Sequence, residues 1–322
     1  QAGLKRILPH QSSQMNLTFF TAPKPFINPH IATIQRNAIQ SWLHLGENVR
    51  VILVGDETGM PDVAAELGTG FLPQVQCNKE GTPLVSSIFE LTRQHSPDPL
   101  LVYLNADILL TPTFLAPVAQ VAEQAERFLI VGQRWDLDIR QPLDFSPGWD
   151  DRLMADTRQR GRLHPPMGSD YFVFPRACFT KMPNFAIGRA GWDNWMFTHA
   201  RLQGWPVIDA TQAITIIHQD HDYSHLPGGQ PHYRLPETTE NIRLAGGRRA
   251  IFTLLDADYS LQHGKLQRIP RRRRKLLREL ETFPLRRLHS YPLAELSFAI
   301  FHPVKAFKEW RGRVAYKLNK RR

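Results

Sequence analysis

The sequence predicts an α/β fold in which a mixed, mostly parallel sheet is flanked by helices, followed by a basic, partly helical C-terminal tail. Short β-branched runs alternate with stretches whose apolar residues recur at helical spacing, which is typical of βαβ units. The 25 prolines and 20 glycines exclude a simple helix bundle or coiled coil. The 42% hydrophobic content can fill a large core, whereas two cysteines are too few for a disulfide framework.

The first half of the chain shows this alternation clearly. Residues 17–20 are an apolar run that prolines soon interrupt, so they predict a buried strand. Asn28-Pro29 then combines a helix cap with a proline at the first helical position, and Gly46 predicts where that helix ends. Further strands are predicted at 49–54, 100–104 and 128–131, and further helices at 62–67, from Thr82 to the residues before Pro97, and from Thr111 to about Glu126.

The second half is less regular. Residues 136–168 are polar and contain several prolines and glycines, so we expect a long loop there. A helix is expected at 192–202, where Gly204 would end it. Short strands are expected at 172–174, 207–208 and 214–217.

Polar residues follow the predicted strands at the edge where parallel sheets bind ligands. They are Thr21, Asp56, Asn105 and Asp107. A carboxylate such as Asp107 can bind a hard divalent cation whose other ligands come from a diphosphate, and Asp56 can accept a nucleobase N–H. An Asx turn at Asn105–Asp107 and an ordinary turn at Asp56 explain the same residues without any function.

Asp193 lies between two tryptophans, Trp192 and Trp195, at the start of a predicted helix. Its charge could simply favour the helix dipole. It could also be a general base whose pKa is tuned by its aromatic surroundings, and the indoles could stack on a sugar. The residues alone do not choose between these interpretations.

His218 ends a β-branched run and could bind a metal through one ring nitrogen while the other is held by an acceptor. A structural histidine at a strand end is the alternative. Together with His221, Asp222 and His225 it also suggests a hydrolase with a metal pair, but the spacing fits no compact ligand motif.

Taken in their order along the chain, these elements resemble a GT-A-type glycosyltransferase over about residues 16–225, similar to the inverting family-2-like enzymes of the nucleotide-diphospho-sugar transferase superfamily. The resemblance implies a Rossmann-like GT-A sheet and a nucleotide-sugar donor. It rests on a strand ending in Asp56, on Asn105-Ala106-Asp107, on Gly168-Ser169-Asp170, on the segment from Gly191 to Trp195, and on His218.

The resemblance also implies roles for individual residues. Thr21, Asp56 and Asn105 would contact the donor nucleotide, and Asp107 and His218 would hold Mn²⁺ or Mg²⁺ on its diphosphate. Asp193 would be the catalytic base, and one displacement would invert the anomeric carbon. Asp170, Trp192 and Trp195 would lie on the acceptor or sugar side.

Two departures from the family pattern keep a second hypothesis open. Asn105 stands where an aspartate is usual, and Trp192 stands where the family carries an acidic pair. The alternative is a catalytically weakened scaffold that binds nucleotide, or an anionic partner through its tail. A sugar nucleotidyltransferase needs a Gly-rich loop after the first strand, and residues 21–26 contain no glycine.

The charge divides the chain into a predicted N-terminal extension (1–15), a glycosyltransferase-like domain (16–264) and a tail (265–322). The tail holds 18 Lys/Arg and 4 Asp/Glu, a net charge of +14, which leaves −4 for the remaining residues. A solvated tail, a membrane anchor and a nucleic-acid-binding segment all fit this charge. Because apolar residues interleave with the basic ones, we favour an anionic membrane surface and do not expect nucleic acid. The expected acceptor is a glycan or a lipid-linked molecule, and the expected location is the cytoplasm, at the inner face of the membrane.

Overall fold

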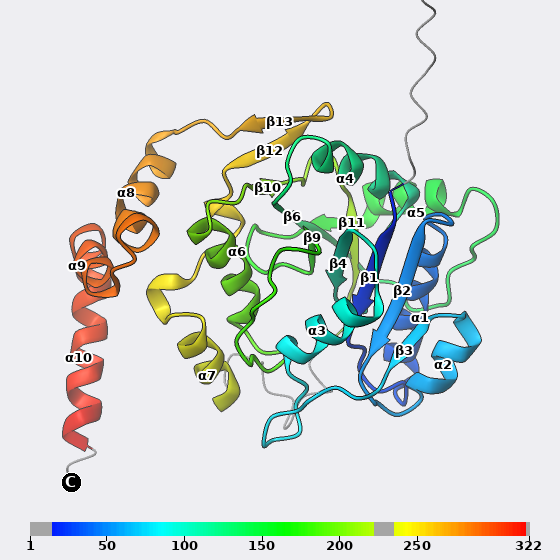
Figure 1. The fold of residues 1–322 in the computed structure, drawn as a ribbon, viewed down its shortest axis with the longest axis horizontal. Coiled ribbons are helices and arrows are strands. Elements are labelled where there is room, and N and C mark those ends of the chain that lie inside the picture. The colour runs from blue at the N-terminus through cyan, green and yellow to red at the C-terminus, as the bar shows by residue number, and fades with distance from the viewer. Residues whose placement is uncertain (1–14, 222–234, 320–322) are drawn as a thin grey trace, which may run out of the picture.

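The computed structural model describes residues 15–221 and 235–319, with side chains of the last helix described as far as residue 312. Residues 1–14 of the predicted N-terminal extension lie outside this part of the chain. Figure 1 shows a central sheet with helices on both faces, and three C-terminal helices at one end. The helices are α1 (Pro29–Leu43), α2 (Met60–Leu67), α3 (Val85–His95), α4 (Leu115–Ala122), α5 (Trp149–Arg160), α6 (Trp192–Leu202), α7 (Pro236–Leu244), α8 (Arg273–Leu288), α9 (Tyr291–Phe301) and α10 (Pro303–Asn319).

The main sheet has nine strands in the order β13-β12-β10-β6-β9-β4-β1-β2-β3. Five of its neighbouring pairs are parallel and three are antiparallel, so the predicted mixed, mostly parallel sheet is confirmed. Its strands are β1 (Leu17–Thr21), β2 (Val49–Val54), β3 (Gly70–Leu72), β4 (Leu100–Leu104), β6 (Leu129–Val131), β9 (Tyr171–Pro175), β10 (Val207–Asp209), β12 (Tyr259–Gln262) and β13 (Lys265–Arg268).

A second, four-stranded sheet has the order β5-β11-β7-β8. Its strands are β5 (Ile108–Leu109), β7 (Arg134–Leu137), β8 (Arg162–Leu163) and β11 (Ile216–Gln219). β11 is parallel to β7 and antiparallel to β5. This small sheet places β5, which follows Asp107, beside β11, which contains His218. It therefore positions the candidate site.

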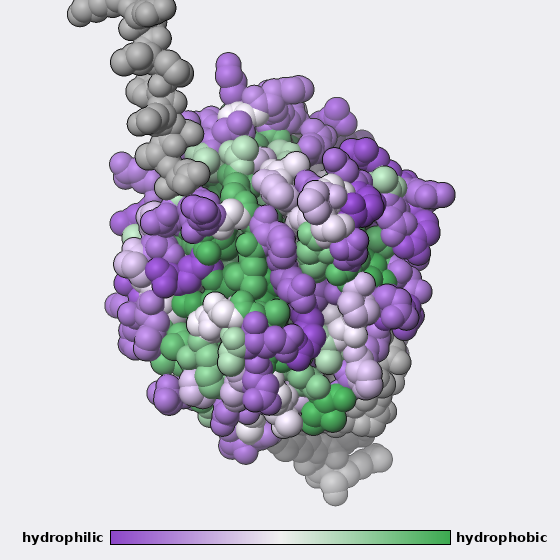
Figure 2. All heavy atoms as spheres, turned by 90° about the vertical axis from the view of Figure 1, so that its right-hand side faces the viewer, coloured by the Kyte–Doolittle hydropathy of each residue, from purple (hydrophilic) through white to green (hydrophobic). Residues whose placement is uncertain are grey.

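The central strands are buried on both faces, because successive side chains point to opposite sides of the sheet. Phe19 packs with α1, α2 and α4 on one face, and Phe20 packs with α3 and α6 on the other. From the end of the molecule that carries α1 and α2, the surface is mostly hydrophilic, with hydrophobic side chains between the polar ones (Figure 2).

Most of the predicted elements are confirmed. The Asn28 side chain caps α1 by accepting from the backbone N–H groups of His30 and Ile31, at 2.9 and 3.2 Å. The helix predicted from Thr111 is shorter than expected, because a 3-10 turn opens it and α4 ends at Ala122. β3, on the edge of the main sheet, was not predicted, since a three-residue strand has too little pattern.

The long loop expected at 136–168 is wrong. This segment contains the end of β7, the helix α5 and the strand β8. α5 lacks a strong apolar stripe, which is why its sequence resembles a loop. Charge supports it instead, since Asp150 and Asp151 lie in its first turn and Arg158 and Arg160 in its last.

The tail does not begin where the charge pattern placed it. Residues 265–268 form β13, which pairs antiparallel with β12 and is the last strand of the main sheet. The backbone turns between these strands at His263-Gly264, both with positive φ, at the point where the composition also changes. The helical part of the tail therefore starts at α8, after residues 269–272.

Candidate functional site

Asp107 and His218 meet because of backbone pairing in the small sheet. Asp107 lies in the turn between β4 and β5, and Ile108 of β5 is paired in register with His218 of β11. The backbone N–H of Gln219 donates to the Asp107 carbonyl at 3.1 Å, which fixes the same junction. Two residues that are distant in the sequence are thus held side by side by strand hydrogen bonds.

A third residue, His221, completes a cluster with these two. One ligand atom from each of Asp107, His218 and His221 lies within 4.8 Å of the other two. The Nε2 atom of His221 lies 3.0 Å from Oδ2 of Asp107. The three side chains are only 11–12% exposed. This partly buried set has the composition of a divalent-metal site.

Two observations test whether a metal ion fits this cluster. The Oδ1 atom of Asp107 is buried and has no hydrogen-bond partner among the described residues, so it retains a lone pair for a further ligand. Burial alone would raise the pKa of Asp107, but the hydrogen bond with His221 and the charges of His218 and Lys24 lower it well below its usual range. An ionised carboxylate with a spare oxygen beside two imidazoles fits a divalent ion.

His218 is oriented by a second layer of carboxylates. Its Nδ1 atom lies 3.4 Å from Oδ1 of Asp136 and 3.6 Å from Oδ1 of Asp220. Burial favours the neutral ring, but the neighbouring Asp136 and Asp107 outweigh this effect and raise the pKa of His218. Because Nδ1 faces these carboxylates, Nε2 is the nitrogen available to a metal, as in carboxylate–histidine–metal arrangements.

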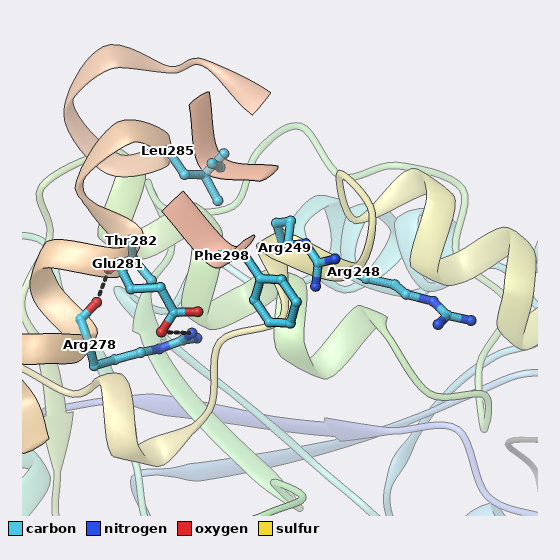
Figure 3. Close-up of a pocket in the computed structure, with 8 residues that line it drawn as sticks. Arg248, Arg249, Arg278, Glu281, Thr282, Leu285 and Phe298 are labelled. Atoms are coloured by element: carbon cyan, nitrogen blue, oxygen red, sulfur yellow. Dashed lines mark hydrogen bonds and ion pairs between the residues drawn. The ribbon is translucent and has the colours of Figure 1, made fainter. Parts of the chain in front are cut away.

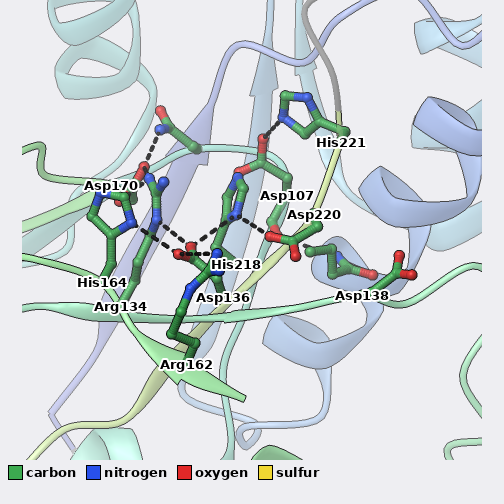
Figure 4. A network of polar contacts seen from close by, with 12 residues as sticks. Asp107, Arg134, Asp136, Asp138, Arg162, His164, Asp170, His218, Asp220 and His221 are labelled. Atoms are coloured by element: carbon green, nitrogen blue, oxygen red, sulfur yellow. Dashed lines mark hydrogen bonds and ion pairs between the residues drawn. The ribbon is translucent and has the colours of Figure 1, made fainter. Parts of the chain in front are cut away.

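Asp136 is itself held by several donors, shown in Figure 4. Nε of Arg134 donates to its Oδ1 and Nδ1 of His164 lies at its Oδ2, each at 2.8 Å. These contacts and His218 lower the pKa of Asp136 far below its usual range despite its burial. Asp136 was not predicted as a site residue, because it lies in the segment expected to be a loop.

Arg134 extends the network to Asp170. Its Nη1 atom is 2.8 Å from each carboxylate oxygen of Asp170. The same carboxylate accepts from the amide of Asn105 at 2.9 Å, and the backbone N–H of Asn105 donates to the Asp170 carbonyl. Asn105 therefore shapes the turn that carries Asp107, and Asp170 is a structural partner of Arg134 and Asn105 in this structure.

Asp193 lies at the start of α6, and its Oδ1 accepts from the backbone N–H of Gly191 at 3.1 Å. Burial raises the pKa of Asp193, and the negative charge of nearby Asp170 adds to that rise. The burial of Tyr103 and the charges of Asp107, Asp170 and Asp193 together raise the pKa of the Tyr103 hydroxyl. Asp107, Asp170 and Asp193 thus all act on the Tyr103 hydroxyl, which lies between the candidate metal cluster and the start of α6.

The two tryptophans beside Asp193 belong to the hydrophobic core. Trp192 is 6% exposed and its ring packs against Tyr103 and Phe172, with centroids 4.9 and 5.4 Å apart. Trp195 is 9% exposed and stacks on His199. Side chains of the protein already cover these indoles, so little of either ring is accessible for stacking on a sugar.

The remaining predicted residues lie at the ends of neighbouring strands. Thr21 ends β1 and is fully buried, and its hydroxyl has no hydrogen-bond partner among the described residues. Asp56 follows β2 and is exposed. Their predicted contacts with a nucleotide stay predictions. Asp222 and His225 lie outside the described residues.

Sequence reasoning missed Lys24 and underused His221. Lys24 follows β1, and its Nζ lies 3.3 Å from Nε2 of His221, so it brings a positive charge to the Asp107 cluster. In the sequence, His221 stands out only as one member of a histidine-rich segment. The signal that could have identified it is its position three residues after His218, just beyond the end of a strand.

No family model matches the chain. No curated protein matches it either.

Solved structures with a similar fold include glucosyl-3-phosphoglycerate synthase from Mycobacterium tuberculosis, at 15% identity and a TM-score of 0.45, covering 80% of this chain and 88% of that one. The same enzyme in complex with Mn²⁺, UDP and phosphoglyceric acid has 14% identity and a TM-score of 0.46, covering 73% and 80%. The mannosyltransferase PcManGT from Pyrobaculum calidifontis, in complex with GDP-Man and Mn²⁺, has 12% identity and a TM-score of 0.41, covering 66% and 59%.

Proposed function

We propose that this protein is a metal-dependent glycosyltransferase that uses a nucleotide-sugar donor. The observation that carries the proposal is the cluster of Asp107, His218 and His221 at the carboxyl end of β4, with its spare carboxylate oxygen. This edge of a parallel sheet is where α/β folds bind nucleotides and other phosphate-bearing ligands. Asp107 and His218 are the metal pair predicted from the sequence, and their ligand atoms lie within 4.8 Å of each other.

Asp107, His218 and His221 would hold Mn²⁺ or Mg²⁺. Bound there, the ion would neutralise the charge that develops on the departing nucleoside diphosphate. One carboxylate with two imidazoles favours Mn²⁺ over Mg²⁺, because Mg²⁺ prefers an all-oxygen shell. Lys24 adds a further positive charge beside this site.

We assign nucleotide binding to Thr21 and Asp56, and an indirect part in it to Asn105. Thr21 and Asp56 end adjacent strands and would contact the nucleobase and ribose. Asn105 is already committed to Asp170 through its amide, so its contribution would be to fix the turn that presents Asp107.

We assign the base to Asp193. Its carboxylate would take the proton from the acceptor hydroxyl while that oxygen bonds to the anomeric carbon and the bond to the diphosphate breaks on the opposite face. This single displacement inverts the anomeric centre. A buried carboxylate with a raised pKa is suited to the task, because it is a stronger base than an exposed aspartate. Asp170 would act on the acceptor side indirectly, by holding Asn105 and Arg134 in place.

The proposed acceptor is a hydroxyl group of a glycan or of a lipid-linked molecule. The basic, apolar tail supports the second choice, and with it a location at the cytoplasmic face of a membrane.

A panel of nucleotides and nucleotide sugars tests the proposal. Thermal denaturation with UDP or GDP should shift to higher temperature only when Mn²⁺ is present, and one nucleotide sugar should be hydrolysed or transferred in a metal-dependent reaction. Binding without turnover across the panel would favour the weakened scaffold suggested by Asn105. A flat melting temperature with every nucleotide would contradict the enzyme and favour a scaffold that binds an anionic partner through its tail.

A further inference from the structure

The C-terminal helices α8 and α9 bury mainly polar or small side chains, which is unusual for helices that only cover a hydrophobic core. The side chains buried from α8 and α9 include Glu281, Thr282 and Ser297, whereas most of their large apolar residues, with the exception of buried Leu285, are partly or fully exposed. Twelve of the sixteen large apolar side chains that are exposed among the described residues lie between Leu276 and Trp310. Such a concentration of exposed apolar surface marks an interaction site.

The exposed apolar residues follow helical spacing. On α8, Leu276, Leu280 and Phe283 lie four and three residues apart and are 44–51% exposed. On α9 and α10, residues 293, 296, 300, 304, 307 and 310 continue at intervals of three or four and are 44–69% exposed. The rings of Phe307 and Trp310 stack with centroids 5.9 Å apart. Each helix thus presents an apolar stripe to solvent.

The charge on this surface has one sign. Every exposed charged side chain from residue 265 to residue 312 is Lys or Arg. The four acids of the tail are partly or fully buried, and each forms an ion pair, with Glu279 bound to Arg271 at 2.9 Å and Glu281 to Arg278 at 3.3 Å. The other two, Glu295 and Glu309, both pair with Arg249. The acids are therefore turned away from solvent, and the exposed charges of this surface are all positive.

Arg249 ties this surface to the domain. It lies in a 3-10 turn (Arg248–Ala250), its side chain is 8% exposed, and its guanidinium also lies 3.4 Å from the centre of the Phe298 ring. These residues line a small cavity of about 50 Å³ between α8, α9 and the domain (Figure 3). Figure 1 shows α8, α9 and α10 stacked along one end of the molecule. The helices are thus docked, and their apolar stripes are held on the outside.

We propose that the outward face of α8, α9 and α10 binds the surface of an anionic lipid bilayer. A bilayer interface offers both partners that this face requires, an apolar layer for the leucine and aromatic side chains and anionic headgroups for Lys and Arg. A second copy of the chain would place two positive faces together, and nucleic acid would leave the apolar stripes in water. No described helix has the length and apolarity to cross a bilayer, so the contact lies in the plane of the interface.

Vesicle flotation with the full chain tests this inference independently of any enzymatic activity. The parent protein should float with vesicles that contain phosphatidylglycerol and stay behind with vesicles of phosphatidylcholine alone, and high salt should release it. The variant Ile300→Gln/Val304→Gln/Phe307→Gln should bind at least about tenfold more weakly, because it removes buried apolar area at the interface. Lys305→Glu/Lys308→Glu should weaken binding to anionic vesicles in the same way.

Matched substitutions on the domain provide the control. Ile27 and Ile300 are both 69% exposed, and Met167 is 64% exposed, so Ile27→Gln/Met167→Gln removes similar apolar surface elsewhere. Lys79→Glu/Lys181→Glu is the corresponding charge control, and both lysines are exposed. Neither control should change flotation. The inference is overturned if the parent does not float with anionic vesicles, if the controls weaken binding as much as the tail variants, or if sedimentation shows that the tail variants abolish a dimer instead.

Discussion

Asp193 is the residue whose chemistry can be tested most directly. Asp193→Asn keeps the size of the side chain and an acceptor for the Gly191 N–H, but it removes the base. We expect turnover to fall by about 10²–10⁴-fold, the usual contribution of a positioned base. Steady-state kinetics with the substrates found in the panel would measure this, and metal and nucleotide binding should not change. Transfer at the parental rate would show that another group takes the proton.

The pH dependence of turnover should report the same carboxyl group. Burial raises the pKa of Asp193, so its protonated, inactive form persists to higher pH than for an exposed aspartate. Turnover should therefore fall as pH decreases through this raised pKa. For stability the sign is opposite, because the fold holds this proton more tightly than the unfolded chain does. Asp193→Asn, which mimics the neutral form, should be at least as stable as the parent at neutral pH, and a large loss of melting temperature would contradict this environment.

Asp136 is expected to act through His218. Asp136→Asn removes the charge that holds the ring and leaves Arg134 and His164 with a weaker acceptor. We expect Mn²⁺ affinity, measured by titration calorimetry, to fall about 10–100-fold, as is usual when an orienting carboxylate is lost. Asp138→Asn is the matched control, since Asp138 is 53% exposed and pairs only with exposed Arg140 among the described residues. If both substitutions leave Mn²⁺ affinity unchanged, Asp136 serves stability alone.

At the residue scale, the sequence predicted the centre of the site and missed its surroundings. Asp107 and His218 were identifiable because each follows an apolar strand. Asp136 and Arg134 were not, because β7 is short and half polar and has no pattern that separates it from a loop. The role of the tryptophans could not be decided, since a Trp-Asp-x-Trp sequence is equally compatible with sugar binding and with core packing. Burial, which decides between the two, depends on contacts far away in the chain.

At the scale of elements, the caps and apolar patterns predicted the central strands and α1 well, and the polar elements poorly. α5 is stabilised mainly by the positions of its charged residues, including the ion pair between Arg160 and Asp156, which lies one turn earlier. Such pairs contribute only about 0.3–0.5 kcal/mol each, so they are a weak signal in a sequence. The last two strands of the main sheet likewise depend on pairing rather than on their own composition, since β12 pairs with β10 and the edge strand β13 pairs with β12.

Arg249 should determine how firmly α9 and α10 dock. Arg249→Ala removes the partner of both Glu295 and Glu309 and the cation that covers Phe298. We expect a cost of about 1.5–3 kcal/mol at this contact, typical of charged hydrogen bonds that lose one partner. Hydrogen exchange of residues 291–312 should become faster while the strands of the main sheet stay protected. Arg248→Ala is the control, because Arg248 is exposed, and equal exchange in the two variants would exclude an anchoring role.

At the scale of the whole molecule, the charge division of the sequence corresponds to a structural division. The domain carries the candidate metal site and a net negative charge, and the tail carries the positive charge on helices at one end. Composition could predict this split, but not its boundary, because β13 belongs to the sheet while sharing the basic composition of the tail. The boundary depends on strand pairing, which composition does not report.

The stability of the whole molecule should respond to the metal ion. An ion that binds the folded chain and not the unfolded one stabilises it by about 2.7 kcal/mol when its free concentration is roughly 100 times its Kd. We expect calorimetry to show a larger rise in melting temperature with Mn²⁺ than with equal Mg²⁺, because two of the three protein ligands are imidazoles. Asp107→Asn should abolish the rise caused by Mn²⁺, whatever its effect on the metal-free protein. A rise of the same size in Asp107→Asn would mean that the ion binds elsewhere, and the proposed donor site would then lose its central component.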